Sequence, residues 1–493
     1  MKKNTLLFIA LATQLFTFAQ THQEKVQETV SKSEIEGHIY FLADDLLQGR
    51  KTGTAENKIA ASYLANTLRG YGVKPNPQTG TYYQPVPMEE VSPTTPFQLS
   101  INGEEQKRKV VLEARRMSLK TKAIFLGYGM EEDYAGQNVR EKIVIVKGGN
   151  KKANDARSAF SLRSEKRELA LKAGAAGIIE LIEADDETWS FIDRNFNATK
   201  VQLAEKDSKE VKGKNNLAYV WIQDAFGGLA KTYEKEAPQV QIKLGGKSSK
   251  AINSQNVVGI VEGTDPLLKN EYVVFTAHYD HVGTGKANAK GDKIYNGARD
   301  NAVGVTTVLS MAENLAKYPT KRSAIFLLLT AEEEGLLGSQ FFVENPIVPL
   351  QQIVYCINSD NGGYNDTSIT TVVGLERTTA SRMFKDAASA FNLVAKGDPA
   401  PEQGLFDRSD NVNFAKKGIP APTYSLGFTA FDAEILKYYH QPADEAESLD
   451  FDYLHQFFSA YVLSGRMITD SESTPFWTKG DKYEAEGKKL YNK

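Results

Sequence analysis

Cysteine is almost absent from this 493-residue chain, in which Cys356 is the only one. A single cysteine excludes an intrachain disulfide, so the fold must be stabilised by its hydrophobic core. Cys356 lies within the apolar run from Ile353 to Ile357. This setting is typical of a buried small side chain and not of a reactive thiol.

An excess of charge of one sign is also missing. The formal net charge is −3, and 25% of the residues are charged. Proteins that bind nucleic acid or an anionic membrane surface through charge carry a clear basic excess. We therefore expect neither partner, and the composition is that of an ordinary globular protein.

Long apolar runs are missing after the first twenty residues. No later segment reaches the roughly 18 apolar residues of a transmembrane helix, so we expect no stable membrane insertion. At the start, Lys2-Lys3 precedes an apolar stretch from Leu6 to Phe18 and a small residue, Ala19. This pattern predicts a signal peptide at 1–19 and export to the periplasm or the cell exterior, with an uncleaved anchor as the alternative.

The length predicts more than one domain, because one hydrophobic core rarely supports 493 residues. Besides the signal peptide, the predicted parts are 20–92, an inserted β-rich domain at 93–250, a main domain continuing at 251–470, and a C-terminal tail at 471–493. The insert opens with the alternating segment Phe97 to Ile101 and the turn Asn102-Gly103. It holds no cluster of acids, bases and histidines, so we expect no chemistry there.

From Asn256 onward, buried strands alternate with helices. Apolar runs predict strands at 257–261, 272–276, 324–330, 353–357, 369–373 and 422–425, and helical spacing predicts helices at 303–317, 335–344, 380–391, 412–417 and 453–469. Strands that are apolar on both faces and separated by helices are typical of a parallel sheet with helices on both sides. The predicted fold class is α/β, with a mostly parallel mixed sheet sandwiched by helices.

Histidines and carboxylates stand where these strands end. The four segments are Ala277-His278-Tyr279-Asp280, Gly297-Ala298-Arg299-Asp300-Asn301, Thr330-Ala331-Glu332-Glu333-Glu334-Gly335 and Cys356-Ile357-Asn358-Ser359-Asp360, with a late partner at His440. In open α/β sheets, ligands bind at the carboxyl ends of the strands. Two histidines and three carboxylates brought to one edge predict a metal site with nitrogen and oxygen ligands.

Each segment alone also has an ordinary structural explanation. Asp300 near a helix start would serve as a cap, and the acids from Glu332 onward would form a solvated helix start. His278 and Asp280 share a face in an extended chain, so Asp280 would orient the imidazole of His278. By the same alternation His281 should point away, as a supporting or structural residue, with metal ligation as the alternative.

Together the segments resemble the co-catalytic dizinc exopeptidases, a family that includes secreted bacterial aminopeptidases, glutamate carboxypeptidases and glutaminyl cyclases. The resemblance rests on His-x-Asp at 278–280, Gly-Ala-x-Asp-Asn at 297–301, Ala-Glu-Glu-x-Gly-Leu-x-Gly-Ser at 331–339, Asn-x-Asp at 358–360 and Tyr-His-x-Pro-x-Asp at 439–444. Residues 41–44 and 49–53 are similar to the family's N-terminal signature, and 409–420 to a later one. The insert is similar to a protease-associated domain at 141–146 and 173–177.

The resemblance implies a role for each matching residue. Asp300 would bridge two zinc ions, with His278 and Asp360 completing one ligand set and Glu333 and His440 the other. Glu332 would be the general base toward water activated by the two ions, and Asp280 would support His278. Three carboxylates and two imidazoles also suit cobalt or manganese.

The implied function is a zinc-dependent aminopeptidase that hydrolyses N-terminal residues from peptides. The alternatives are a carboxypeptidase for C-terminal acidic residues, for which Arg299 and Arg408 offer positive charge, and an inactive protease-associated binding or receptor protein, which should lack a metal ligand. A cyclase is less favoured because the Glu332-Glu333 pair and the full ligand set are intact. Arg299, Asn361 and Asn411 depart from the family pattern, and we expect them to border the site and affect substrate preference.

Overall fold

The computed structural model describes residues 20–204 and 217–492. The predicted signal peptide at 1–19 lies outside these residues. The chain divides into two compact units, one formed by residues up to Val86 together with those from Asn253 onward, and the other by Pro87–Ile252. The chain leaves the first unit within β2 (Tyr83–Ile101) and returns within β11 (Gln239–Val261). Of the helices in the described residues, none combines the length and the apolarity needed to cross a membrane.

The first unit is built on a mixed sheet. Its strands run in the order β18-β17-β19-β16-β12-β15-β11, and β1 pairs with β11. Their bounds are β1 Lys74–Pro75, β12 Tyr272–His278, β15 Ser323–Leu329, β16 Ile353–Ser359, β17 Ile369–Val373, β18 Val394–Lys396 and β19 Thr423–Leu426, and a separate small hairpin is formed by β13 Gly283–Thr284 and β14 Ile294–Tyr295.

Four parallel strands form the centre of this sheet. β12 pairs in parallel with β15 on one side and with β16 on the other, and β16 pairs in parallel with β19. β15 and β16 are buried along their whole length, as the continuous apolar runs predict. β11 and β17 join antiparallel at the two flanks. The predicted mostly parallel, mixed sheet is confirmed.

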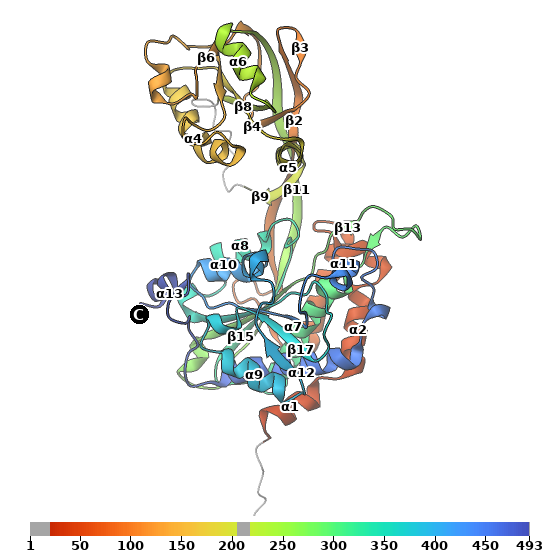
Figure 1. Ribbon diagram of the computed structural model, residues 1–493. Helices are drawn as coiled ribbons and strands as arrows, with labels where there is room; N and C mark the ends of the chain where they lie inside the picture. Colours follow the sequence, from red (N-terminus) through yellow and green to blue (C-terminus); the bar gives the residue numbers. More distant parts are fainter. Residues whose placement is uncertain (1–19, 205–216, 493) are drawn as a thin grey trace, which may run out of the picture. The chain divides into compact units, whose positions relative to one another are not determined.

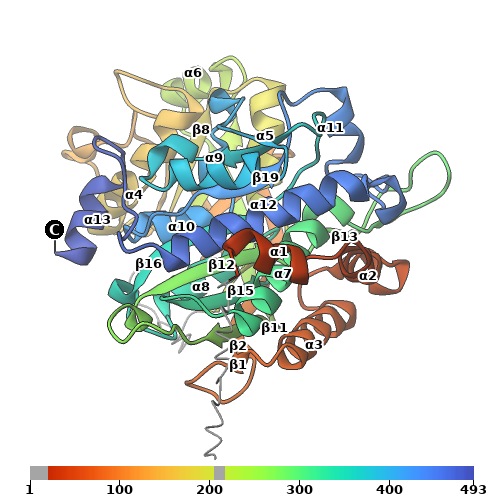
Figure 2. The ribbon, with the colours of Figure 1, turned by 90° about the horizontal axis from the view of Figure 1, so that it is seen from below.

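Helices cover both faces of the sheet (Figures 1 and 2). Their bounds are α1 His22–Thr29, α2 Lys32–Leu42, α3 Ala55–Gly70, α7 Gly304–Lys317, α8 Leu337–Glu344, α9 Ser381–Ser389, α10 Asn411–Lys416, α11 Ala433–Tyr438, α12 Phe451–Asp470 and α13 Glu484–Tyr491. One core packs α1, α2, α3, α7, α9 and α12 against one face, and a second packs α8, α10 and α13 against the other. Figure 2 shows α12 beside α1 and α7.

The second unit contains a five-stranded sheet in the order β4-β10-β8-β7-β6, with a hydrophobic core on each side. Its elements are β3 Glu104–Glu105, β4 Lys109–Glu113, β5 Met117–Lys122, β6 Ile124–Phe125, β7 Ile143–Lys147, β8 Gly177–Ile182, β9 Lys200–Leu203, β10 Ala218–Gln223, α4 Ala156–Lys172, α5 Asp186–Phe196 and α6 Gly228–Lys235. Its protease-associated identity stays a prediction.

A buried ion pair joins α4 to this sheet. Lys166 Nζ lies 2.5 Å from Glu180 Oε1, and both side chains are at most 1% exposed. Tyr219 and Trp221 donate hydrogen bonds to the other oxygen of Glu180. Both oxygens of the Glu180 carboxylate therefore accept hydrogen bonds. A buried charge pair is tolerated when its polar atoms are satisfied in this way.

Removing one partner of this pair should destabilise the second unit strongly. We expect Glu180→Ala to lower its free energy of unfolding by about 3–5 kcal/mol, because the buried ammonium of Lys166 would lose its counterion and Tyr219 and Trp221 would lose their acceptor. Urea unfolding followed by tryptophan fluorescence measures this, since Trp189 and Trp221 both lie in the unit. The control Glu187→Ala, on the exposed side of α5, should stay within about 0.5 kcal/mol of the wild type. A loss below about 1 kcal/mol for Glu180→Ala would contradict the assignment.

Candidate metal centre

The carboxyl ends of the parallel strands bring the predicted residues together. His278 is the last residue of β12, Glu332 and Glu333 follow β15, and Asp360 follows β16. Because the three strands run in parallel and adjacent, their ends meet at one edge of the sheet. Asp300 lies in the irregular turn Ala298–Val303 that leads into α7, and His440 lies in the turn after α11.

Two of these turns place an ordinary residue in the left-handed region of the backbone. Ala331, just before Glu332, has φ +58°, and His440 has φ +52°. Such conformations cost energy for residues other than glycine and are concentrated at functional sites. The backbone is therefore strained at two of the points that carry candidate ligands.

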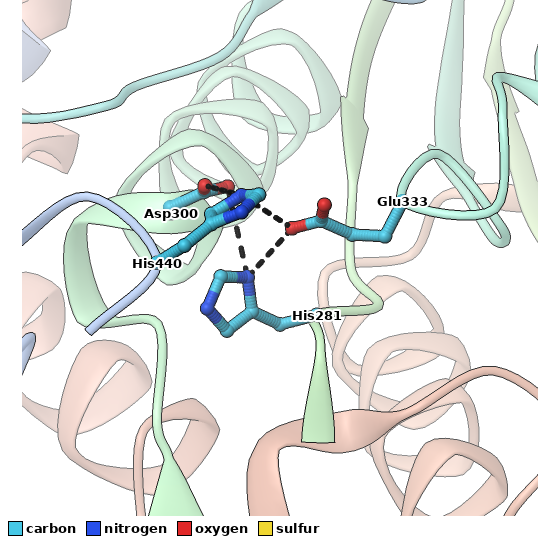
Figure 3. Close-up of side chains that lie close together, drawn as sticks. All are labelled: His281, Asp300, Glu333 and His440. Carbon is cyan, nitrogen blue, oxygen red and sulfur yellow. Dashed lines mark hydrogen bonds and ion pairs between the residues drawn. The ribbon is translucent and has the colours of Figure 1, made fainter. Parts of the chain in front are cut away.

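Asp300 lies between two groups of side chains and offers one oxygen to each. Its Oδ1 is 3.3 Å from His278 Nε2, which is also 3.3 Å from Asp360 Oδ1. Its Oδ2 is 3.1 Å from His440 Nε2, which is 3.3 Å from Glu333 Oε1. Two atoms bound at 2.0–2.1 Å to one tetrahedral ion are about 3.3 Å apart. Both groups thus have the spacing of a metal site. Figure 3 shows the group of His440 and Glu333 with Asp300.

His281 also reaches this cluster, contrary to the prediction that it points away. Its Nδ1 lies 2.8 Å from Glu333 Oε1 and 3.9 Å from Asp300 Oδ1. The expectation was wrong because β12 ends at His278, and side-chain alternation holds only while the chain is extended. Figure 3 shows the ring of His281 directed at Glu333.

Asp280 is buried beside the cluster, but its carboxylate does not hydrogen-bond to the imidazole of His278 as predicted. Its carboxylate accepts hydrogen bonds from the backbone N–H groups of Glu332 and Glu333, at 3.1 and 3.3 Å. His278 Nδ1 donates instead to the backbone carbonyl of Asp280 at 3.1 Å, while the carboxylate is 3.9 Å away. Nε2 of His278 is therefore the nitrogen directed at the cluster, and the carboxylate of Asp280 supports the Glu332-Glu333 turn.

The N-terminal segment supplies two further supports that the sequence did not reveal as such. Thr52 donates a hydrogen bond to Asp280 Oδ2 at 3.0 Å. Arg50, only 1% exposed, donates to the backbone carbonyls of Tyr279, Asn296 and Gly297. These contacts connect the loop after β12 with the turn that carries Asp300. Their only signal in the sequence is the resemblance of residues 49–53 to a family signature.

A pocket opens onto the cluster. Its lining consists of His278, Asp300, Glu332, Glu333, Asp360, Gly362, Gly363, Val373, Leu405, Arg408, Ser409, Thr423, Ser425, Phe428, Phe431, Ile435, Tyr439 and His440. One part is therefore polar and the other apolar, with a single arginine among the lining residues. A concave, partly apolar site with converging polar groups is the usual form of a small-ligand site.

The comparison with protein families agrees with this geometry. The sequence model of the family described as Peptidase family M28 matches residues 256–463 of this chain. This segment is similar to peptidase family M28. It contains all five predicted ligands and Glu332, whereas Arg50 and Thr52 lie outside it.

Individual relatives match over part of their length. Aminopeptidase YwaD of Bacillus subtilis is 27% identical over 233 residues, which are 46% of this chain and 47% of that protein. Aminopeptidase Y of Saccharomyces cerevisiae is 27% identical over 237 residues, 45% of this chain and 39% of that protein. The chain thus matches less than half the length of these curated relatives. An aminopeptidase structure from Aneurinibacillus sp. strain AM-1 has a TM-score of 0.56 at 19% identity, covering 92% of this chain and 97% of that one, and it shows the shared fold.

The three residues that depart from the family pattern do not line the pocket of this M28 segment. Arg299 is 3% exposed, and its guanidinium binds Asp444 at 3.0 Å. Asn361 and Asn411 are fully buried and donate to neighbouring oxygens of Asn301, Phe406 and Ala421. The prediction that they border the site was wrong, because each side chain turns inward to satisfy a buried polar group.

The buried charges of the M28 cluster strongly perturb each other. Burial acts to lower the pKa of His278, but Glu332 and Asp360 outweigh it and raise the pKa well above its usual value. Burial acts in the opposite direction on Glu333, whose pKa is nevertheless lowered to about 2 by His281 and His440. Burial, together with Asp360, raises the pKa of Glu332 well above normal. A carboxylate with a raised pKa is better matched to proton transfer near neutral pH.

Asp280→Asn should weaken metal binding. An asparagine has one acceptor oxygen, so the N–H of Glu332 or Glu333 would face an amide NH₂ group, and the turn would shift. We expect a 10–100-fold lower affinity for Zn²⁺, measured by competition with a chromophoric chelator. Asp193→Asn, exposed on α5 of the second unit, is the matched control. Unchanged affinity in Asp280→Asn would show that Asp280 does not position the ligands.

Proposed function

We propose that this chain is a zinc-dependent exopeptidase that removes N-terminal residues from peptides. The observation that carries the proposal is the position of Asp300, which offers its two oxygens to two groups of ligand atoms at the mouth of one pocket. The M28 match and the names of the two relatives, both aminopeptidases, support the same activity.

The donor atoms fit two zinc ions. His278, Asp360 and Asp300 Oδ1 would hold one ion, and His440, Glu333 and Asp300 Oδ2 the other. Nitrogen and oxygen ligands at these spacings suit tetrahedral zinc, and each set of three protein atoms leaves a position for water or substrate. The same atoms would accept cobalt or manganese.

Two bound ions would supply Lewis-acid polarisation of the scissile carbonyl and a lower pKa for water. The carboxylate of Glu332, which lines the pocket, takes a proton from the attacking water and passes it to the leaving amine as the C–N bond breaks. Tyr439 lines the pocket and stacks on His440, with ring centroids 4.3 Å apart. Burial raises the pKa of Tyr439, so its hydroxyl stays protonated and can donate a hydrogen bond to the developing oxyanion.

The test is hydrolysis of free-amine aminoacyl anilides and their N-acetylated counterparts by the metal-loaded protein. We expect cleavage of the free-amine substrates only, and loss of activity after chelation. Glu332→Gln should lower kcat by at least about 10²-fold with little change in bound metal, because it removes the base and keeps the side chain's shape. Glu36→Gln, half-buried on α2, is the control.

The other possible results of this hydrolysis test would each contradict the proposal in a different way. Cleavage of acetylated and free-amine substrates alike would contradict recognition of the amine. Bound metal without cleavage would direct attention to the carboxypeptidase alternative, and absence of both metal and cleavage would favour the inactive binding protein.

Arg408 is the observation that favours the second candidate, a carboxypeptidase for acidic C-terminal residues. Its exposed side chain lines the pocket, whereas Arg299 is occupied by Asp444. A guanidinium binds a carboxylate with two parallel hydrogen bonds, which makes Arg408 a fit for a substrate terminus or an acidic side chain.

Arg408→Ala separates the two activities. For an aminopeptidase, kcat/KM toward aminoacyl anilides should change by less than about threefold, since these substrates carry no carboxylate. For a carboxypeptidase, kcat/KM toward peptides ending in glutamate should fall by at least about 10²-fold, in line with the strength of a charged hydrogen bond. Arg382→Ala, exposed on α9, is the control.

Export and the role of the second unit complete the proposal. The N-terminal pattern supports cleavage before Gln20, which the mass of the mature protein would reveal. Residues 141–146 and 173–177 are similar to a protease-associated domain, which supports that identity for the second unit. All residues to which we assign a chemical role lie outside this unit.

A further inference from the structure

His281 is the one imidazole at the metal centre to which the family resemblance assigns no role. Its side chain is fully buried. Its ring meets the ring of His440 edge-on, with centroids 5.4 Å apart, and packs against Gly297, where an added Cβ would lie 2.6 Å from His281 Cδ2. The ring is therefore held in one orientation from two sides.

The distances separate His281 from the residues that have the spacing of ligands. Pairs that would share an ion are 3.1–3.3 Å apart, whereas His281 Nδ1 and Glu333 Oε1 are 2.8 Å apart. The shorter value is that of an N–H···O hydrogen bond to a charged acceptor. The Asp300 oxygen nearest His281 is Oδ1, at 3.9 Å, and this oxygen belongs to the group of His278.

We propose that His281 is a positioning residue whose Nδ1–H donates a hydrogen bond to Glu333 and thereby orients this carboxylate for the ion shared with His440. This inference rests on the proposed two-ion site. A carboxylate oxygen has two lone pairs, so Glu333 Oε1 can accept from His281 and still bind an ion. The group of His278 has its own support in the backbone carbonyl of Asp280, and His281 gives the other group an equivalent one.

The second nitrogen of His281 supports this role. Nε2 is buried and has no hydrogen-bond partner among the described side chains and backbone, and Figure 3 shows it directed away from Glu333 and Asp300. An apolar ring of similar shape would avoid leaving a polar atom unsatisfied. The imidazole is thus useful at this position only through Nδ1.

The test replaces His281 in the full-length protein with side chains that place an amide nitrogen at the position of either Nδ1 or Nε2. The amide nitrogen of asparagine occupies the position of Nδ1, and that of glutamine reaches the position of Nε2. The readouts are the dissociation constants of the two Zn²⁺ ions, by chelator competition, and the melting temperature of the metal-free protein. kcat and KM on the preferred substrate form a separate measurement.

We expect His281→Gln and His281→Phe to weaken one of the two ions by 10–100-fold and to leave the other unchanged, as for loss of a support to a metal ligand. His281→Asn should keep both affinities within about threefold of the wild type. Equal loss in all three variants would make His281 a ligand and overturn the proposal. Unchanged affinities, with at most a lower melting temperature, would make it purely structural and also overturn it.

This outcome is independent of the proposed activity. If the wild type binds two ions and cleaves no N-terminal residue, the proposed function fails, and the affinity series still decides the role of His281. If the wild type is active and asparagine does not restore binding, only the role of His281 fails.

Discussion

The fold depends on a concentration of buried negative charge at one edge of its sheet. Asp280, Asp300, Asp410 and Asp444 are each at most 4% exposed, and Glu332, Glu333 and Asp360 lie beside them. Like charges in a poorly solvated region disfavour ionisation, so some of these groups hold protons unless a cation is near. The pKa of Asp300 is held well below normal by His281, His278 and His440 against the effect of burial, whereas burial raises the pKa of Asp410 to about 7. Asp300 and Glu333, which lie next to imidazoles, are thus kept ionised, and both are candidate ligands.

The rest of the unit holds this edge together against repulsion. Arg50 donates to four backbone carbonyls, three of which lie on two different loops of the site, and burial lowers its pKa to about 10, which still leaves it charged at neutral pH. On the other side, Arg299 donates a hydrogen bond to the carboxylate of Asp444. The same carboxylate accepts a hydrogen bond from the backbone N–H of Asp300, so it connects the two parts of the chain. Because Arg50 belongs to the segment before the M28 match, the metal centre depends on the N-terminal residues as well as on the matched ones.

The strands, most helices and the convergence of the candidate ligands at one edge of the sheet could be predicted from the sequence, because these follow from local patterns. Short apolar runs such as Ala324 to Leu329, set between helical patterns, favour buried strands, and the end of a parallel strand fixes where the next side chain lies. The role of Asp280 and the orientation of His281 depended instead on the chain path after β12, which leaves the extended conformation within a residue or two. The inward turn of Arg299 depended on Asp444, 145 residues later in the chain, a distance that no local pattern spans.

For the proposed exopeptidase, the sign of the charge left in the pocket would decide which end of a peptide binds. Asp300, Glu332, Glu333 and Asp360 line it, and two divalent ions would offset their four charges, which leaves Arg408 as the remaining charged side chain. A pocket with net positive charge repels the protonated α-amine of a substrate. An aminopeptidase therefore needs a carboxylate whose negative charge the ions do not fully neutralise. Asp360 meets this condition best among the three aspartate and glutamate ligands, since its side chain is 18% exposed against 6% for Asp300 and 11% for Glu333. Its second oxygen, together with the exposed position of Arg408 at the pocket wall, would let the amine and the carboxylate of a short peptide bind at different points of one site.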